Sequence, residues 1–145
     1  MTTRIRRIST PAICFSLFLA TACLLHGCAT GPSLPSNAVQ IGPSQNNSRV
    51  TLKPGQMLVI ELERNPSTGY IWQFIDTPNQ EVVLSDNTLT YQTSQQIADE
   101  DNIAEQYLRF VAQQPGETNI RLNYVRPEVG PSASAPIYTI HVVVE

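Results

Sequence analysis

Short alternations of apolar and polar residues, separated by turn residues, dominate the chain from Arg49 to its end. Side chains of a β-strand point alternately to its two faces, so a strand with this period can bury one face and expose the other. No segment has the apolar stripe of a packed helix, although residues 95–106 could hold one polar helical turn. The pattern therefore predicts an all-β domain.

The alternation and the turn residues together indicate about seven or eight strands. The predicted strands are residues 50–52, 57–63, 70–75, 82–84, 88–93, 107–112, 118–126 and 137–144. The segments 82–84 and 88–93 form either two strands or one broken strand. Short strands with frequent turn signals are typical of a β-sandwich. We expect Trp72 to pack between the two sheets, because large aromatic side chains fill such cores.

Residues 1–27 have the features of a bacterial lipoprotein signal peptide. Three arginines lie among the first seven residues, and residues 12–25 are apolar but too short to span a bilayer as a mature helix. The apolar stretch ends at Leu25-His26-Gly27-Cys28, which resembles a lipobox. We expect cleavage before Cys28 and acylation of its thiol. Because His26 replaces the usual small residue, a secretory signal that is cut elsewhere is one alternative, and a chance apolar N-terminus is another.

Residues 28–48 are rich in glycine, proline, serine and asparagine, which predicts a flexible tether. The folded domain would then comprise residues 49–145. Ala29, rather than an aspartate, follows Cys28, as in lipoproteins that are sent to the outer membrane. We therefore expect a domain that is anchored in the bacterial outer membrane through Cys28 and faces the periplasm.

The composition of the mature chain argues against several classes of protein. Cys14 and Cys23 lie in the leader, so the domain has no disulfide and must fold on its own core. Six of the nine basic residues and all twelve acidic residues follow residue 27, which gives a net charge of 6 − 12 = −6. A negative charge of this size argues against a nucleic-acid partner.

The mature chain also offers little material for catalysis. Its one histidine, His141, lies in the middle of the last predicted strand, where we expect it to face solvent. No nucleophile elbow or phosphate-binding glycine loop is present. The run Asp99-Glu100-Asp101 is weak as a metal site and is interpreted as a solvated loop. We expect a monomeric binding module without a metal or cofactor, and not an enzyme.

One predicted connection between strands, Asn65-Pro66-Ser67-Thr68-Gly69-Tyr70, is unusually rich in turn-forming residues. Pro66 fixes its φ angle at a value suited to the second position of a type I turn. The side chain of Asn65 can accept a hydrogen bond from the backbone two residues on, and Gly69 can adopt a positive φ. These features predict a stiff connection, either an ordinary turn or a binding loop.

The same six residues resemble the central loop of the chagasin family, protein inhibitors of papain-like cysteine proteases. That family carries Asn-Pro-Thr-Thr-Gly followed by an aromatic residue, and Ser67 replaces the first threonine here. Further along, Arg126-Pro127 resembles the start of the family's Arg-Pro-Trp loop, with Glu128 in the place of the tryptophan. The two motifs occur in the family's order, and the resemblance covers about residues 50–144.

The resemblance implies an immunoglobulin-like β-sandwich that inhibits papain-like cysteine proteases with loops gathered at one end. The residues that would bind the protease are Asn65, Pro66, Ser67, Thr68, Gly69 and Tyr70 over the catalytic cysteine, and Arg126 and Pro127 beside the cleft. The family's third loop is rich in glycine, whereas residues 94–105 here have none and are acidic. Together with Glu128, this departure implies weak inhibition or an unusual target protease.

Two other functions are compatible with the residues. The sandwich could be a non-inhibitory envelope lipoprotein that binds another periplasmic protein or a cell-wall glycan. It could also be a structural component of an envelope assembly. In both cases residues 65–70 would be no more than a stiff turn.

Overall fold

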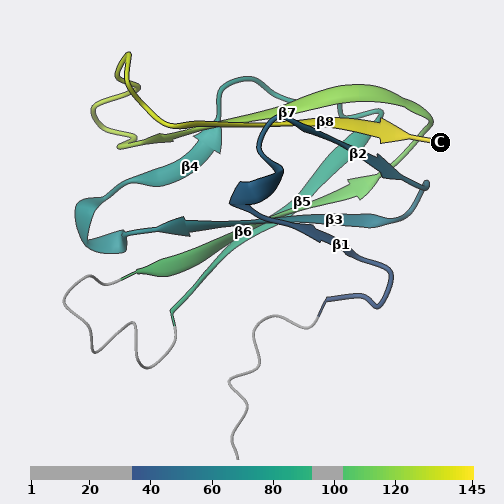
Figure 1. The fold of residues 1–145 in the computed structure, drawn as a ribbon, viewed down its shortest axis with the longest axis horizontal. Coiled ribbons are helices and arrows are strands. Elements are labelled where there is room, and N and C mark those ends of the chain that lie inside the picture. Colours follow the sequence, from purple (N-terminus) through teal and green to yellow (C-terminus); the bar gives the residue numbers. More distant parts are fainter. Residues whose placement is uncertain (1–33, 93–102) are drawn as a thin grey trace, which may run out of the picture.

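The computed structural model describes residues 34–92 and 103–145, which form two four-stranded sheets packed face to face (Figure 1). One sheet has the strand order β1-β3-β6-β5 and the other β2-β8-β7-β4. The strands are β1 (Val39–Ile41), β2 (Ser48–Leu52), β3 (Met57–Arg64), β4 (Ile71–Phe74), β5 (Val83–Tyr91), β6 (Ala104–Ala112), β7 (Gly116–Val125) and β8 (Ile137–Val144). Within these residues the helical elements are two 3-10 turns, η1 (Pro43–Gln45) and η2 (Pro66–Thr68). The predicted all-β sandwich of about eight strands is confirmed.

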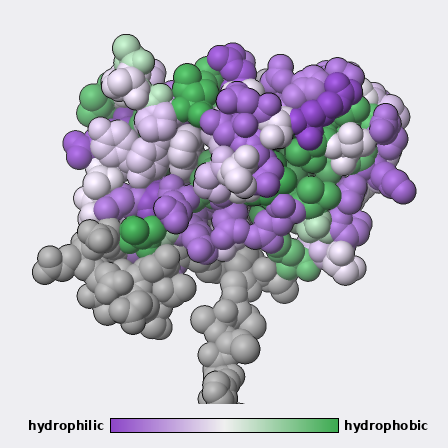
Figure 2. Space-filling model, in the orientation of Figure 1, coloured by the Kyte–Doolittle hydropathy of each residue, from purple (hydrophilic) through white to green (hydrophobic). Residues whose placement is uncertain are grey.

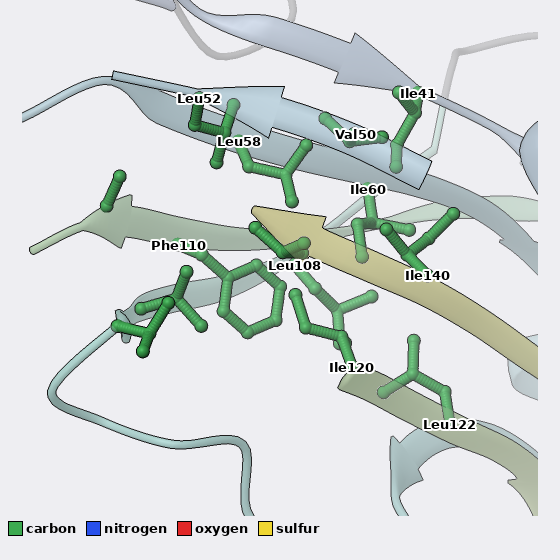
Figure 3. Close-up of a cluster of buried hydrophobic side chains, with 14 of the residues drawn as sticks. Ile41, Val50, Leu52, Leu58, Ile60, Leu108, Phe110, Ile120, Leu122 and Ile140 are labelled. Carbon is green, nitrogen blue, oxygen red and sulfur yellow. The ribbon is translucent and has the colours of Figure 1, made fainter. Parts of the chain in front are cut away.

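The core lies between the sheets and is built from the apolar positions of the predicted alternation (Figure 3). The side chains that lose nearly all their solvent exposure there include Leu58, Ile60, Leu108 and Phe110 from one sheet and Ile120, Leu122 and Ile140 from the other. Burial of each such side chain contributes about 1.5–3 kcal/mol to folding. Figure 2 shows the complementary outer surface, where polar side chains predominate and apolar ones form small separate groups.

Most predicted strands are present, with ends that differ by a few residues. The predicted strand 137–144 coincides with β8, and segments 82–84 and 88–93 are the broken strand, β5, with a bulge between Ser85 and Asn87. The predicted helical turn is wrong for residues 104–106, which begin β6. Its positions 95–102 lie outside the described residues.

The folded domain begins before Arg49, so the predicted tether boundary at Ser48 is wrong. β1 pairs in parallel with β3, and Ile41 in β1 is buried in the core. The hydroxyl of Tyr138 in β8 donates to the carbonyl of Gly42 at 2.7 Å. Burial raises the pKa of Tyr138 to about 12, which keeps this hydroxyl protonated as the donor. Residues 39–48 are therefore part of the sandwich.

The two ends of the sandwich carry different segments of the chain. β3 ends at Arg64 and β7 ends at Val125, and the connections that follow them lie at the same end (left in Figure 1). We call this the loop end. Because β1 runs parallel to β3, the chain enters the domain at the opposite end, where the C-terminus also lies (Figure 1).

Deletion of residues 34–48 is expected to destabilise the domain by at least about 3 kcal/mol. The burial of Ile41 contributes about 2 kcal/mol, and the hydrogen bond from Tyr138 to Gly42 contributes about 1 kcal/mol. Urea denaturation of a chain that starts at Leu34 and of one that starts at Arg49 measures the difference. Equal unfolding midpoints would show that the segment is a tether after all.

Candidate functional site

All eight predicted protease-binding residues lie at the loop end, in two connections. The first loop (residues 65–70) joins β3 to β4, and the second loop (residues 126–136) joins β7 to β8. Arg126 brings the two loops together: its Nε donates to the carbonyl oxygen of Thr68 at 2.7 Å, and its guanidinium carbon lies 5.1 Å from the centre of the Tyr70 ring. Two motifs that are distant in sequence therefore form one surface.

The first loop is closed by its own hydrogen bonds. Asn65 precedes the 3-10 turn η2, and its Oδ1 accepts from the amide of Ser67 at 3.0 Å and from the Ser67 hydroxyl at 2.5 Å. The Thr68 hydroxyl donates to the Asn65 carbonyl at 2.7 Å. Gly69 has a φ of 74°, in the left-handed region that favours glycine. The predicted turn is thus present and closed by these hydrogen bonds, and Ser67 is exposed at its tip.

Tyr124, near the end of β7, supports the first loop from beneath. Its hydroxyl accepts a hydrogen bond from the amide of Asn65 at 2.9 Å. Its ring stacks on Tyr70, with the centroids 5.3 Å apart, and lies 5.1 Å from the ring of Trp72. The alternation placed Tyr124 on the face of Ile120 and Leu122, but nothing in the sequence showed that it would contact both ends of the first loop.

Trp72 and Gln106 connect the two sheets directly behind the first loop. Trp72 packs against the core, as predicted, but stays half-buried because it lies near the loop end. β4 is an edge strand, yet the Trp72 amide donates to Gln106 Oε1 at 3.1 Å and the Trp72 carbonyl accepts from Gln106 Nε2 at 2.8 Å. Gln106 belongs to β6 in the other sheet and is only 3% exposed. Its carboxamide therefore pairs with the free edge of β4.

Gln106 was missed because the predicted strand began at Tyr107, which left Gln106 in the polar segment before it, whereas β6 begins at Ala104. The available signal was its spacing. Gln106 lies two residues before Leu108 and four before Phe110, and therefore on the same face of the strand. A buried carboxamide is stable in such a place only when its donor and acceptor are both used. Trp72 provides one partner for each.

The second loop begins with a tight turn. The Arg126 carbonyl accepts from the amides of Val129 and Gly130, at 3.1 and 2.9 Å, and Gly130 has a φ of 81°. Pro127 and Glu128 are exposed, and Val129 is 77% exposed at the tip. The predicted residues Arg126 and Pro127 thus lie beside the first loop, with Glu128 and Val129 projecting beyond them.

The third predicted connection lies largely outside the described residues, together with Asp99, Glu100 and Asp101. The strands on either side of it are described. Ala104 at the start of β6 pairs with Arg64 at the end of β3, and Tyr91 at the end of β5 pairs with Glu105. The connection therefore starts and finishes at the loop end.

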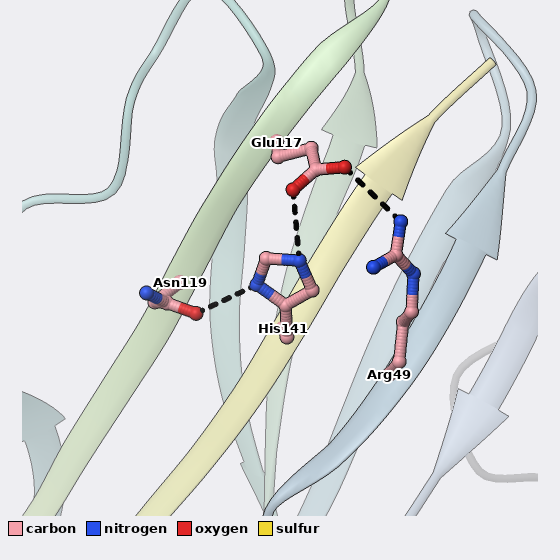
Figure 4. A network of polar contacts seen from close by, with 4 residues as sticks. All are labelled: Arg49, Glu117, Asn119 and His141. Carbon is pink, nitrogen blue, oxygen red and sulfur yellow. Dashed lines mark hydrogen bonds and ion pairs between the residues drawn. The ribbon is translucent and has the colours of Figure 1, made fainter.

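His141 lies far from these loops, on the outer face of the β2-β8-β7-β4 sheet (Figure 4). Its ring nitrogens lie 3.0 Å from Asn119 Oδ1 and 3.2 Å from Glu117 Oε2, and Glu117 also pairs with Arg49 at 3.0 Å. The side chains come from three adjacent strands, so the network is cross-strand pairing. The expected position of His141 on the solvent face of its strand is confirmed.

Residues 34–92 and 103–145 contain no group of three or more side chains suited to hold a metal ion. Among the same residues, no helix has the length and apolar character needed to cross a bilayer.

Comparison with known sequences identifies related inhibitors. The profile of the Chagasin family peptidase inhibitor I42 matches residues 51–142. Chagasin of Trypanosoma cruzi is 23% identical over 106 residues, which cover 70% of this chain and 94% of chagasin.

Solved structures with the same fold include three inhibitors or related proteins. The cysteine protease inhibitor EhICP2 from Entamoeba histolytica superposes with a TM-score of 0.65 at 19% identity, covering 74% of this chain and 96% of its own. PbICP-C, solved in complex with falcipain-2, gives 0.57 at 20% identity over 75% and 99%. Amebosin gives 0.56 at 25% identity over 77% and 100%. The immunoglobulin-like sandwich implied by the sequence is thereby confirmed.

Replacement of Gln106 by leucine is expected to lower the free energy of unfolding by about 3 kcal/mol, because the Trp72 amide and carbonyl lose their partners. Leucine has approximately the same volume as glutamine, so the substitution mainly removes the hydrogen bonds to Trp72. Urea denaturation followed by tryptophan fluorescence measures the loss.

Gln113→Leu is the matched control. Gln113 is exposed, and its side chain donates to the nearby carbonyl of Val111, so its replacement should change the free energy of unfolding by no more than about 0.5 kcal/mol. Equal stabilities of the two variants would show that the pairing of Gln106 with β4 contributes nothing.

Proposed function

Because the chain belongs to the chagasin family of peptidase inhibitors, we propose that it inhibits papain-like cysteine proteases by placing the first loop over the catalytic cysteine. It acts as a monomeric binding protein and not as an enzyme. The observation that carries the proposal is the contact of Arg126 with Thr68 and Tyr70, which joins the two family motifs into one surface at the loop end.

The rigidity of the first loop supports an inhibitory mechanism. The hydrogen bonds of Asn65 and Thr68 and the stacking of Tyr70 on Tyr124 hold the turn in place before any partner arrives. A preorganised loop loses little conformational entropy on docking, so more of the contact energy remains as affinity. Exposed Ser67 and Tyr70 would enter the cleft, while the closed 3-10 turn between them offers no extended segment for cleavage.

The second loop would contact one wall of the cleft. Arg126 supports the first loop from this side, and Pro127 and the residues after it are exposed. PbICP-C, whose structure was solved with falcipain-2, provides a precedent for a protein of this fold bound to a protease. In this chain the wall contact would be made by Pro127, Glu128 and Val129.

We also propose that the chain is an outer-membrane lipoprotein, acylated at Cys28 and facing the periplasm. Cys28 lies outside the described residues, but the point where the chain enters the domain supports the arrangement. β1 runs toward the loop end, so a tether from Cys28 would attach at the opposite end. The eight residues of β3 separate the two ends by about 26 Å. The loops would therefore point away from the bilayer.

The inhibitory role of the first loop is tested by Ser67→Arg and Gly69→Val. Ser67→Arg adds a long charged side chain at an exposed tip, so the melting temperature should hardly change, whereas inhibition of papain should fall by at least about a hundredfold because the charge would be buried without a partner. A Cβ on Gly69 would meet only Arg126 Nε, at 4.0 Å, so Gly69→Val acts through backbone strain. It should lower both stability, by about 1–2 kcal/mol, and inhibition.

Ser44→Arg is the control for the added charge. Ser44 is exposed on the other 3-10 turn, η1, which also has the order proline then serine. It should leave both the inhibition constant and the melting temperature unchanged. If Ser67→Arg inhibits papain as strongly as the wild-type chain does, the first loop is only a turn, and a non-inhibitory binding module is favoured.

Acylation is tested separately with Cys28→Ala. The wild-type chain should incorporate labelled palmitate and sediment with the membrane fraction, because the diacylglyceryl group is joined by a thioether to the sulfur of Cys28. The variant should incorporate no label and appear in the soluble periplasmic fraction. Absence of label from the wild-type chain would rule out the lipoprotein.

A further inference from the structure

The tip of the second loop carries two exposed side chains that are not explained by contacts within the described residues. Glu128 is exposed and makes no hydrogen bond or ion pair with any residue in 34–92 or 103–145. Val129 is 77% exposed, whereas Ile137, which follows the same loop, is 53% exposed. A charged side chain next to an exposed apolar one, at a loop tip, contributes little to folding and is suited to contact a partner.

The tip is held in a fixed position relative to the first loop. The Arg126 carbonyl binds the amides of Val129 and Gly130 and so closes the turn that presents the tip. The Arg126 side chain at the same time binds the Thr68 carbonyl at 2.7 Å. A partner that docks on the first loop therefore meets Glu128 and Val129 at a defined place.

Glu128 carries the charge at the tip of the second loop. The guanidinium of Arg126 is directed back onto Thr68 and Tyr70. In residues 127–136 the only charged side chain is that of Glu128. The tip of the second loop thus presents to the partner the negative charge of Glu128 beside the apolar side chain of Val129.

We propose that Glu128 and Val129 select the target, favouring papain-like proteases whose cleft wall presents an apolar patch beside a lysine or arginine. This inference rests on the proposed inhibitory function. Complementary charges at the rim of an interface speed association, and like charges slow it, so one carboxylate discriminates between proteases of opposite rim charge. Val129 would add apolar burial, which slows dissociation.

The test measures association and dissociation rates of Glu128→Lys against papain-like proteases of known structure, chosen in two groups by the sign of the charge on the cleft wall. For basic walls the association rate should fall about tenfold, and for acidic walls it should rise by a similar factor. Both changes should shrink at high salt, since screening shortens the range of the interaction. Val129→Ser should speed dissociation about tenfold where the wall is apolar.

Glu81→Lys is the matched control, because it makes the same change in net charge at the other end of the sandwich. Glu81 is exposed and precedes β5, whose first residue pairs with Ala112 near the start of β3. This variant should change association rates less than about twofold. If Glu128→Lys matches Glu81→Lys for every protease that the wild-type chain inhibits, the selecting role of the tip is overturned and inhibition by the first loop stands. If the wild-type chain inhibits no protease in either group, both proposals fall.

Discussion

The packing of one sheet against the other determines where the first loop lies. β3 belongs to one sheet and β4, the next strand, to the other, so residues 65–70 are the segment in which the chain crosses between them. Packed sheets lie about 10 Å apart, and the loop must span that distance within a few residues. At the end of β4 farther from the loop, the rings of Phe74 and Phe110 meet edge to face across the two sheets, with the centroids 5.9 Å apart, and attach β4 to the opposite sheet. The loop's position is thus fixed by the core.

Hydrogen bonds at the loop end add to the apolar packing that holds β4 against the opposite sheet. An edge strand of only four residues, such as β4, has few backbone partners, and its free edge would otherwise take up water or another chain. Gln106 supplies a donor and an acceptor to Trp72, while the indole Nε1 of Trp72 donates to the Glu63 carbonyl at 2.9 Å. These bonds join Trp72 in β4 to two strands of the opposite sheet, β6 through Gln106 and β3 through Glu63. They restrain the loop without using any of its exposed side chains, which remain available to a partner.

The sequence predicted the parts of this structure that depend on local pattern. Period-two alternation gave β8 at its full length, because β-branched residues fill it and a proline precedes it. Pro66 and Gly69 gave the first loop, because each restricts or permits a specific backbone geometry. The family motifs then indicated that this loop and Arg126 would share one end of the sandwich. Their direct contact required the folded chain.

The parts that were missed depend on tertiary contacts. β1 has three residues, too few to show alternation, and it lies among the prolines and glycines that suggested a tether. Its stability comes from pairing with β3 and from burial of Ile41, neither of which is visible in the segment itself. Val59 lies on the same face of β3 as Glu61 and Glu63, yet it is fully buried. Period-two alternation distinguishes the two faces of a strand, but it does not show how much of each face is buried by other parts of the chain.

The change from tryptophan to Glu128 in the second loop alters the balance between affinity and selectivity. A buried aromatic anchor contributes on the order of 2 kcal/mol to binding of almost any apolar cleft wall, so its absence weakens inhibition of all targets together. A carboxylate contributes less, about 1 kcal/mol in a solvated pair, but the sign of its contribution depends on the partner. The result is a lower mean affinity and a larger difference between proteases. The proposed anchor at Cys28 would confine the loops and raise their local concentration, which would offset weaker binding. A higher concentration would not add discrimination between proteases.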